Sequence, residues 1–247
     1  MMGFPKGDPY LGTNEQNQTL ERQFTRKAEI MYRLGTPIWN GEFGPVYANP
    51  RLDEDAEKIN EKRYALLGQQ LTIYDKYQIH WSIWLYKDIG VQGMVHVDPE
   101  SKWMKTIGPF LEKKRALQLD AWGRYPSKQV EDVINPLVDW IKKVAPTSDE
   151  QYPTPWQTER QITRLINQIW LSTCLSDEFA EQFKDMSLDE LDECARSFHF
   201  DRCVQREGLN KALEAHSEVP KLTKDTQRPP NLWLESQNGH DEELAND

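Results

Sequence analysis

One carboxylate, Glu42, stands between two glycines at the end of an apolar run in residues 37–45, whose sequence is PIWNGEFGP. A glutamate beside aromatic bulk is costly unless it is paired or has a chemical task, and a carboxylate can act as a nucleophile or a general base. The ordinary alternative is a helix cap or a salt bridge at the rim, which is the commoner role of a surface glutamate. The flanking residues favour the chemical interpretation.

The residues around Glu42 predict a strand that delivers its side chain to one end of a sheet. Ile38 and Trp39 are strand formers, Pro37 suits the first residue of a strand, and the glycines allow a tight turn or a close approach to a ligand. A second run of the same build, IHWSIWLYK, occupies residues 79–87. We predict that both runs are strands of a barrel and that Glu42 lies at its mouth.

Apolar residues recur at helical spacing on either side of these strands. One helix is predicted over residues 15–34, where Gly35 is a natural stop, and another from the acidic cluster at 53–55 to Tyr74. Helix, strand, helix and strand in this order are typical of stacked βα units with a parallel sheet. A long loop follows Lys87, and a helix over residues 108–119 closes the unit. In that loop His96 and Asp98 could face a substrate, with ordinary loop contacts as the alternative.

The two strand runs resemble motifs of the retaining glycoside hydrolases of family 5, the cellulase family. The motif that carries the nucleophile, at the end of the seventh strand of that family's (β/α)8 barrel, is matched by Trp39, Gly41, Glu42, Phe43 and Gly44. Trp84 looks like the aromatic residue of the eighth strand that floors the sugar site. The resemblance covers about residues 1–125. It implies Glu42 as the catalytic nucleophile, with substrate bound by Trp84, Trp39, Tyr86 and Lys87.

The resemblance also implies a double displacement on a β-linked glucan or glycoside, in which Glu42 attacks the anomeric carbon and forms a glycosyl-enzyme intermediate. A second carboxylic acid, about 5 Å away, must protonate the leaving oxygen. In the family this acid comes from an Asn-Glu pair that ends the fourth strand, and strands one to six of that barrel have no counterpart in this sequence. Asp88 stands on the neighbouring rim, but its solvated loop gives no reason for the raised pKa that an acid catalyst needs. We therefore expect the carboxyl-terminal part of a longer hydrolase, which needs the amino-terminal part of its barrel as a partner.

The chain beyond Ser127 shows helical patterns, and no strand is predicted there. Helices are predicted over 129–144, 155–175, 177–184, 187–197 and 203–216, and Ser187 with Glu190 has the pattern of a capping box. Residues 220–247 are polar, and we predict disorder for them. The predicted fold class is α/β: the last two βα units of a TIM (β/α)8 barrel over residues 1–125, an all-α extension over 126–219 and a disordered tail over 220–247.

Composition and charge argue against several classes of partner and cofactor. The 247 residues carry a net charge of -10, which disfavours binding to nucleic acid and to anionic membrane surfaces. No apolar run is long enough to span a bilayer and no signal sequence is recognisable, so the compartment is left open. The cysteines are odd in number, and no Gly-rich phosphate loop appears, so neither a disulfide framework nor a cofactor is predicted. The spacing of Cys194, His199 and Cys203 fits no standard zinc site, and no metal is predicted.

Two classes of function follow from the sequence. The first is a retaining glycoside hydrolase, present as a fragment that lacks its acid/base residue. The alternative is a non-catalytic helical interaction module that carries a relic of a barrel. Because a two-stranded sheet with free edges is marginal in water, residues 1–125 alone are expected to associate or to dissolve poorly.

Overall fold

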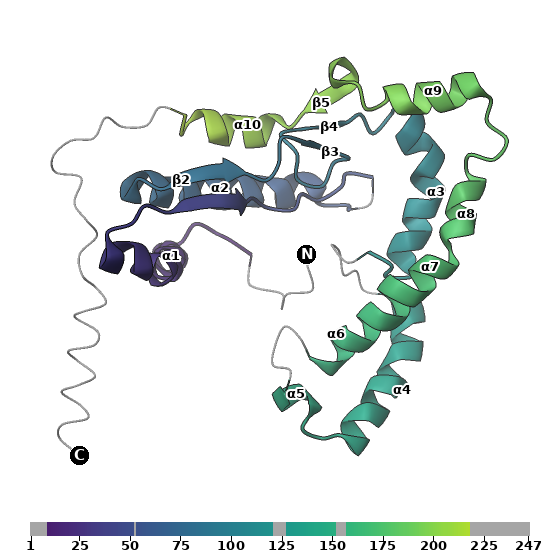
Figure 1. Cartoon of the computed structure of the whole chain (residues 1–247), viewed down its shortest axis with the longest axis horizontal. Coiled ribbons are helices and arrows are strands. Elements are labelled where there is room, and N and C mark those ends of the chain that lie inside the picture. Colours follow the sequence, from purple (N-terminus) through teal and green to yellow (C-terminus); the bar gives the residue numbers. More distant parts are fainter. Residues whose placement is uncertain (1–8, 52, 121–126, 152–156, 218–247) are drawn as a thin grey trace. The chain divides into compact units, whose positions relative to one another are not determined.

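The computed structural model describes residues 9–51, 53–120, 127–151 and 157–217, and these form two compact units. The sheet unit joins Pro9–His96 to the segment that begins at Val204, and the helical unit is Val97–Cys203. Figure 1 shows the elements of both units. The compact units divide after His96 and after Cys203. This division does not test the predicted domain boundary at residue 125, which stays a prediction. The predicted disordered tail, 220–247, lies outside the described residues.

The sheet unit is built on two helices and a parallel pair of strands. Its elements are α1 (Asn14–Leu34), β1 (Trp39–Phe43), α2 (Ala56–Tyr77), β2 (His80–Ile83), β3 (Lys87–Asp88), β4 (Val95–Val97), β5 (Cys203–Gln205) and α10 (Glu207–Glu214). Val97, which ends β4, and Cys203, which begins β5, are counted with the helical unit. The side chain of Thr13 caps α1, and Gly35 ends it with a φ of 64°. The predicted helix over 15–34 is therefore confirmed, with the glycine in the left-handed conformation that ends helices.

β1 and β2 pair in parallel, with α2 as the connection between them. The pairing aligns Trp39 with His80 and Phe43 with Ile83. This is the βα arrangement that the order of elements predicts. The predicted strand over 79–87 is wrong in its length, because β2 ends at Ile83 and the chain starts the separate strand β3 at Lys87. That strand pairs with β4 in a second, three-stranded sheet of order β3-β4-β5.

The core of the sheet unit is one apolar cluster to which both α2 and α10 contribute. Leu67 and Leu71 of α2 and Leu209 of α10 are fully buried in one apolar cluster. The prediction that no strand follows Ser127 and that the rest of the chain is an all-α extension is wrong here. Residues 203–205 form β5 beside β4, and the helix predicted from Cys203 begins only at Glu207. Backbone pairing across a long sequence separation overrides the local helical pattern.

The helical unit contains only helices between β4 and β5 in its described residues. These are α3 (Lys102–Ala116), α4 (Lys128–Val144), α5 (Ser148–Gln151), α6 (Thr158–Thr163), the π-helix η1 (Arg164–Leu171), α7 (Ser172–Cys174), α8 (Ser176–Glu181), α9 (Leu188–Arg196) and the 3₁₀ turn η2 (Phe200–Arg202). Ser187 and Glu190 form the predicted capping box at the start of α9. The helix predicted over 108–119 begins earlier, at Lys102, because Ser101 caps it.

Candidate active site

A bulge in β1 decides which way Glu42 faces. Asn40 pairs with Trp81 and Phe43 with Ile83, so Gly41 and Glu42 together stand opposite a single residue of β2. Phe43 packs against Tyr74 of α2, with ring centroids 5.0 Å apart. Strict alternation from Asn40, which also contacts α2, would put Glu42 toward the helix and Phe43 away from it. The extra residue reverses this, and Glu42 is exposed while Phe43 is half-buried.

The face of β1 and β2 away from α2 is therefore the one that carries the candidate residues. Trp39 is 68% exposed, and its indole Nε1 donates a hydrogen bond to the Ser82 hydroxyl at 3.2 Å. The opposite face is fixed by a second bond, from the Asn40 side chain to the hydroxyl oxygen of Tyr74 at 2.9 Å. Burial raises the pKa of the Tyr74 hydroxyl, and the bond from Asn40 works against this rise. One face is thus held by the core, and the other carries the exposed indole of Trp39.

Trp84 lies directly beyond β2, at the same end of the sheet as Glu42. Its backbone nitrogen donates to the carbonyl oxygen of Phe43 at 2.7 Å, which continues the parallel pairing past the end of both strands. The side chain is 42% exposed, and the peptide bond from Trp84 to Leu85 is cis. Gly44 has a φ of 147°, and a Cβ there would come within 2.8 Å of the Trp84 carbonyl oxygen. Close approach of the two backbones therefore requires a glycine at this position.

Tyr86 lies directly before β3, and Lys87 is the first residue of that strand. Tyr86 is 60% exposed, and Lys87 is half-buried. Their backbone is fixed by the return of the chain, because Val95 donates to the Tyr86 carbonyl oxygen at 3.0 Å. Of the predicted site residues, the structure thus places Glu42 and Trp84 on paired backbones, and Tyr86 and Lys87 a few residues farther along the chain.

Asp88 has a structural task in this loop. Its carboxylate accepts hydrogen bonds from the backbone nitrogens of Gly90, Val91 and Gln92, at 2.8, 3.1 and 2.5 Å. A carboxylate committed to three amides is poorly placed to give a proton to a leaving group. The expectation that Asp88 lies in a solvated loop is wrong, because this residue is half-buried in β3. Asp98 likewise accepts from the backbone nitrogen of Glu100 at 2.8 Å, which is the ordinary loop contact that the sequence left open.

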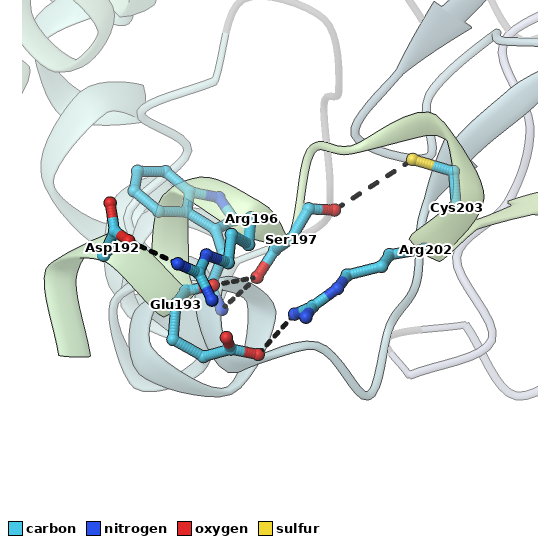
Figure 2. Close-up of polar contacts among 7 residues, drawn as sticks. Asp192, Glu193, Arg196, Ser197, Arg202 and Cys203 are labelled. Carbon is cyan, nitrogen blue, oxygen red and sulfur yellow. Dashed lines mark hydrogen bonds and ion pairs between the residues drawn. The ribbon is translucent and has the colours of Figure 1, made fainter. Parts of the chain in front are cut away.

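The cysteines and the histidine of the helical unit do not form a metal site. Among the described residues no three His, Cys, Asp or Glu side chains lie together in a way that could hold a metal ion. The Cys203 thiol instead donates to the His199 carbonyl oxygen at 3.2 Å, and Figure 2 shows it turned toward Ser197 at the end of α9. Cys194 is buried and Cys174 exposed, and all three thiols are free. In the same described ranges, no helix has the length and apolar character that crossing a membrane requires.

Sequence reasoning missed three residues that support this region. Ser82 holds the Trp39 indole, Gln92 donates from Nε2 to the Gly44 carbonyl oxygen at 3.3 Å, and Arg206 contacts the β3–β4 loop from far along the chain. Alternation along β2 could have placed Ser82 on the same face as Trp84. No local sequence pattern predicts the roles of Gln92 and Arg206, because both side chains bind backbone carbonyls of segments remote in sequence.

Comparison with known proteins gives one informative similarity. No family model matches this chain, and no solved structure matches it. Over 217 residues the chain is 46% identical to a beta-xylosidase of Phanerodontia chrysosporium, an alignment that covers 86% of this chain and 45% of that protein. The chain therefore spans about half the length of the curated relative that it matches, and over that span it is similar to part of a beta-xylosidase.

Proposed function

We propose that this chain carries the nucleophile half of a retaining β-glycosidase site, with Glu42 as the nucleophile. The observation that carries the proposal is the parallel pairing of β1 with β2, which brings an exposed carboxylate and the exposed indole of Trp84 to the same end of one sheet. Similarity to a protein named beta-xylosidase supports hydrolysis of a glycosidic bond as the reaction class. We also propose that the chain is related to glycoside hydrolase family 5, with β1 and β2 as the last two strands of its TIM barrel.

In this proposal the Glu42 carboxylate attacks the anomeric carbon of a β-linked sugar and forms an ester-linked glycosyl intermediate, while the leaving oxygen takes a proton from a second carboxylic acid. Water then attacks the same carbon, gives its proton to the second carboxylate, and releases Glu42. Trp39 and Trp84 supply flat apolar surfaces beside the carboxylate on which a sugar ring can stack. Tyr86, directly before β3, and Lys87, its first residue, offer a hydroxyl and an ammonium group to sugar oxygens.

We further propose that the acid/base residue is supplied by a segment beyond the described residues. Asp88, a carboxylate of the next strand along the chain, accepts hydrogen bonds from three backbone amides. The alignment leaves room for such a segment, since more than half of the relative has no counterpart in this chain. For the substrate, the relative's name points to a β-xyloside, and the family resemblance points to a β-linked glucan or glycoside.

Covalent labelling tests the nucleophile. A 2-deoxy-2-fluoro-β-xyloside with a good leaving group slows the second step, so the sugar accumulates on the nucleophile. The sample is a fusion of this chain with the part of the full-length relative that the chain lacks. We expect intact-mass analysis of this fusion protein to show one added fluoroxylosyl group. Peptide mapping is expected to place that group on Glu42. Glu42→Gln removes the label, whereas Glu61→Gln, an exposed glutamate on α2, keeps it. A label on another carboxylate would overturn the assignment.

A non-catalytic interaction module remains the second candidate, and one observation favours it. The helical unit exposes large apolar side chains: Trp140 of α4 is 59% exposed, Trp170 of η1 is 73% exposed, and Leu165 is 57% exposed. Exposed apolar surface of this kind commonly marks an interaction site. If the full-length protein takes no covalent label, and replacing Trp140 and Trp170 by serine changes its size in solution, this second candidate is the better account.

A further inference from the structure

Arg206 is a buried cation whose partners all lie in the sheet unit. The residue is 8% exposed. Its guanidinium donates a hydrogen bond from Nε to the Gly93 carbonyl oxygen at 3.0 Å and another from Nη2 to the Gly90 carbonyl oxygen at 2.9 Å. The backbone nitrogen of Arg206 also donates to the Met94 carbonyl oxygen at 2.8 Å. Three carbonyls of one loop are thus held by one residue, and that loop is the continuation of Tyr86 and Lys87.

The same guanidinium also contacts the segment that follows Glu42. Its carbon lies 4.2 Å from the centre of the Tyr47 ring, which is a cation–π distance. The Tyr47 backbone nitrogen donates in turn to the Val91 carbonyl oxygen at 2.7 Å. Arg206 therefore stands where the chain beyond Glu42 meets the loop beyond Trp84, and it contacts both.

We propose that Arg206 is a positioning residue for the candidate active site, holding the β3–β4 loop in the place that Tyr86 and Lys87 need to meet a substrate bound at Glu42. This inference rests on the proposed glycosidase function. It makes the carboxyl-terminal segment part of the site's support, although that segment is remote from Glu42 in sequence. The planar fork of arginine is essential to the role, because two carbonyls and a ring face are contacted at once.

Lysine is the informative replacement. It keeps the positive charge and most of the aliphatic stem, but its ammonium group cannot reach two carbonyls in a fixed plane. Arg206→Lys is therefore expected to make the β3–β4 loop more mobile without leaving a cavity in the core. Arg206→Met also removes the positive charge. Arg202→Lys serves as the matched control, because Arg202 is an exposed arginine of the helical unit that forms an ion pair with Glu193.

Amide hydrogen exchange of the whole chain gives the first measurement. In Arg206→Lys we expect the amides of residues 88–94 to exchange at least about tenfold faster than in the unaltered protein, while those of residues 67–74 in α2 keep their rates. Arg202→Lys is expected to match the unaltered protein in both segments. Unchanged exchange in the loop overturns the proposal, and so does equal acceleration in α2, which would make Arg206 a contributor to global stability only.

Sugar binding gives the second measurement, which a purely structural role would not move. Xylobiose is titrated into ¹⁵N-labelled protein, and the indole N–H resonance of Trp84 is followed. Arg206→Lys is expected to raise the dissociation constant by about tenfold, with the thermal midpoint close to that of the unaltered protein. Equal affinity in the two proteins overturns the proposal. If the unaltered protein does not bind xylobiose, the proposed function loses its support in this chain, and the exchange result alone decides whether Arg206 positions the loop.

Discussion

The backbone nitrogen of Trp84 donates a hydrogen bond to the carbonyl oxygen of Phe43 at 2.7 Å. The residue that follows Glu42 is therefore bonded directly to the residue whose indole is the candidate sugar platform. Backbone contacts of this kind fix positions more tightly than contacts between long side chains, because fewer torsions separate the two groups. The geometry of the candidate site thus depends on how closely two stretches of main chain approach.

Gly44→Ala tests that close approach. The added methyl group would lie 2.8 Å from the Trp84 carbonyl oxygen and 3.1 Å from the Ile83 Cδ1 atom, at a φ of 147° that side chains disfavour. We expect a loss of about 1–3 kcal/mol in the free energy of unfolding, measured by urea denaturation. Gly68→Ala is the matched control, since nothing lies within 4 Å of its added carbon and it sits inside α2. That control should be neutral or stabilising by up to about 1 kcal/mol, and equal losses in both variants would contradict the argument.

Leu209→Ala tests whether α10 belongs to the core of the sheet unit. Leu209 is fully buried, in the same cluster as Leu67 and Leu71 of α2. We expect a loss of about 2–5 kcal/mol in the free energy of unfolding, because the truncation leaves a cavity. Leu188→Ala, at a leucine that is 84% exposed, should change it by less than about 0.5 kcal/mol. Similar small effects at both positions would show that α10 does not pack as described.

Glu21 links α1 to α2, and its protonation state should show in the stability of the sheet unit. Burial raises the pKa of the Glu21 carboxyl, but hydrogen bonds from Lys76 and Tyr77, each at 2.5 Å, outweigh it and hold that pKa below its ordinary value. A carboxyl whose folded-state pKa is lowered stabilises the fold above its unfolded-state pKa. That contribution disappears as the pH falls through the folded-state value.

The variant Glu21→Gln is therefore expected to be less stable than the unaltered protein at pH 7, by about 1 kcal/mol, and to approach it as the pH falls below about 4. Urea midpoints measured across this range give the comparison. Glu29→Gln is the control, because Glu29 pairs with Arg33 of its own helix and not with α2. A gap for Glu21→Gln that stays constant from pH 7 to pH 3 would argue against the linkage.

Excision of the helical unit tests whether the sheet unit folds alone. β4 and β5 are neighbours in one sheet, so the chain leaves the sheet unit and returns to it at adjacent strands. Replacing residues 98–202 with a short Gly/Ser linker should give a monomer that melts cooperatively, as judged by light scattering and calorimetry. Residues 1–125 alone lack α10 and Arg206, and should associate. Aggregation of the excised chain to the same degree would mean that the two parts depend on each other.

The sequence predicts the local elements of this protein well and the long-range ones poorly. The helix ended by Gly35 and the capping box of Ser187 depend on neighbouring residues, and both appear as expected. The parallel order of β1 and β2 follows from the helix between them. The strand β5 was missed because Cys203–Gln205 becomes extended only by lying beside β4.

The candidate site divides in the same way. A motif of adjacent residues singles out Glu42, and its position at the end of β1 follows from the strand pattern. The bulge that turns its side chain to the open face could not be predicted, because it is visible only in the pairing with β2. Arg206 could not be predicted for a related reason. Its partners are backbone carbonyls, which every residue carries, so no acidic residue in the sequence indicates where the arginine binds.

The discontinuous sheet unit has a consequence for synthesis of the chain. A ribosome releases the strands that carry Glu42 and Trp84 long before α10, so these strands emerge without the leucines that complete their core. The helical unit is contiguous in sequence, so all of its packed helices have been synthesised before α10. We therefore expect the segment bearing the candidate carboxylate to be the last part to become protected from proteases as the nascent chain lengthens.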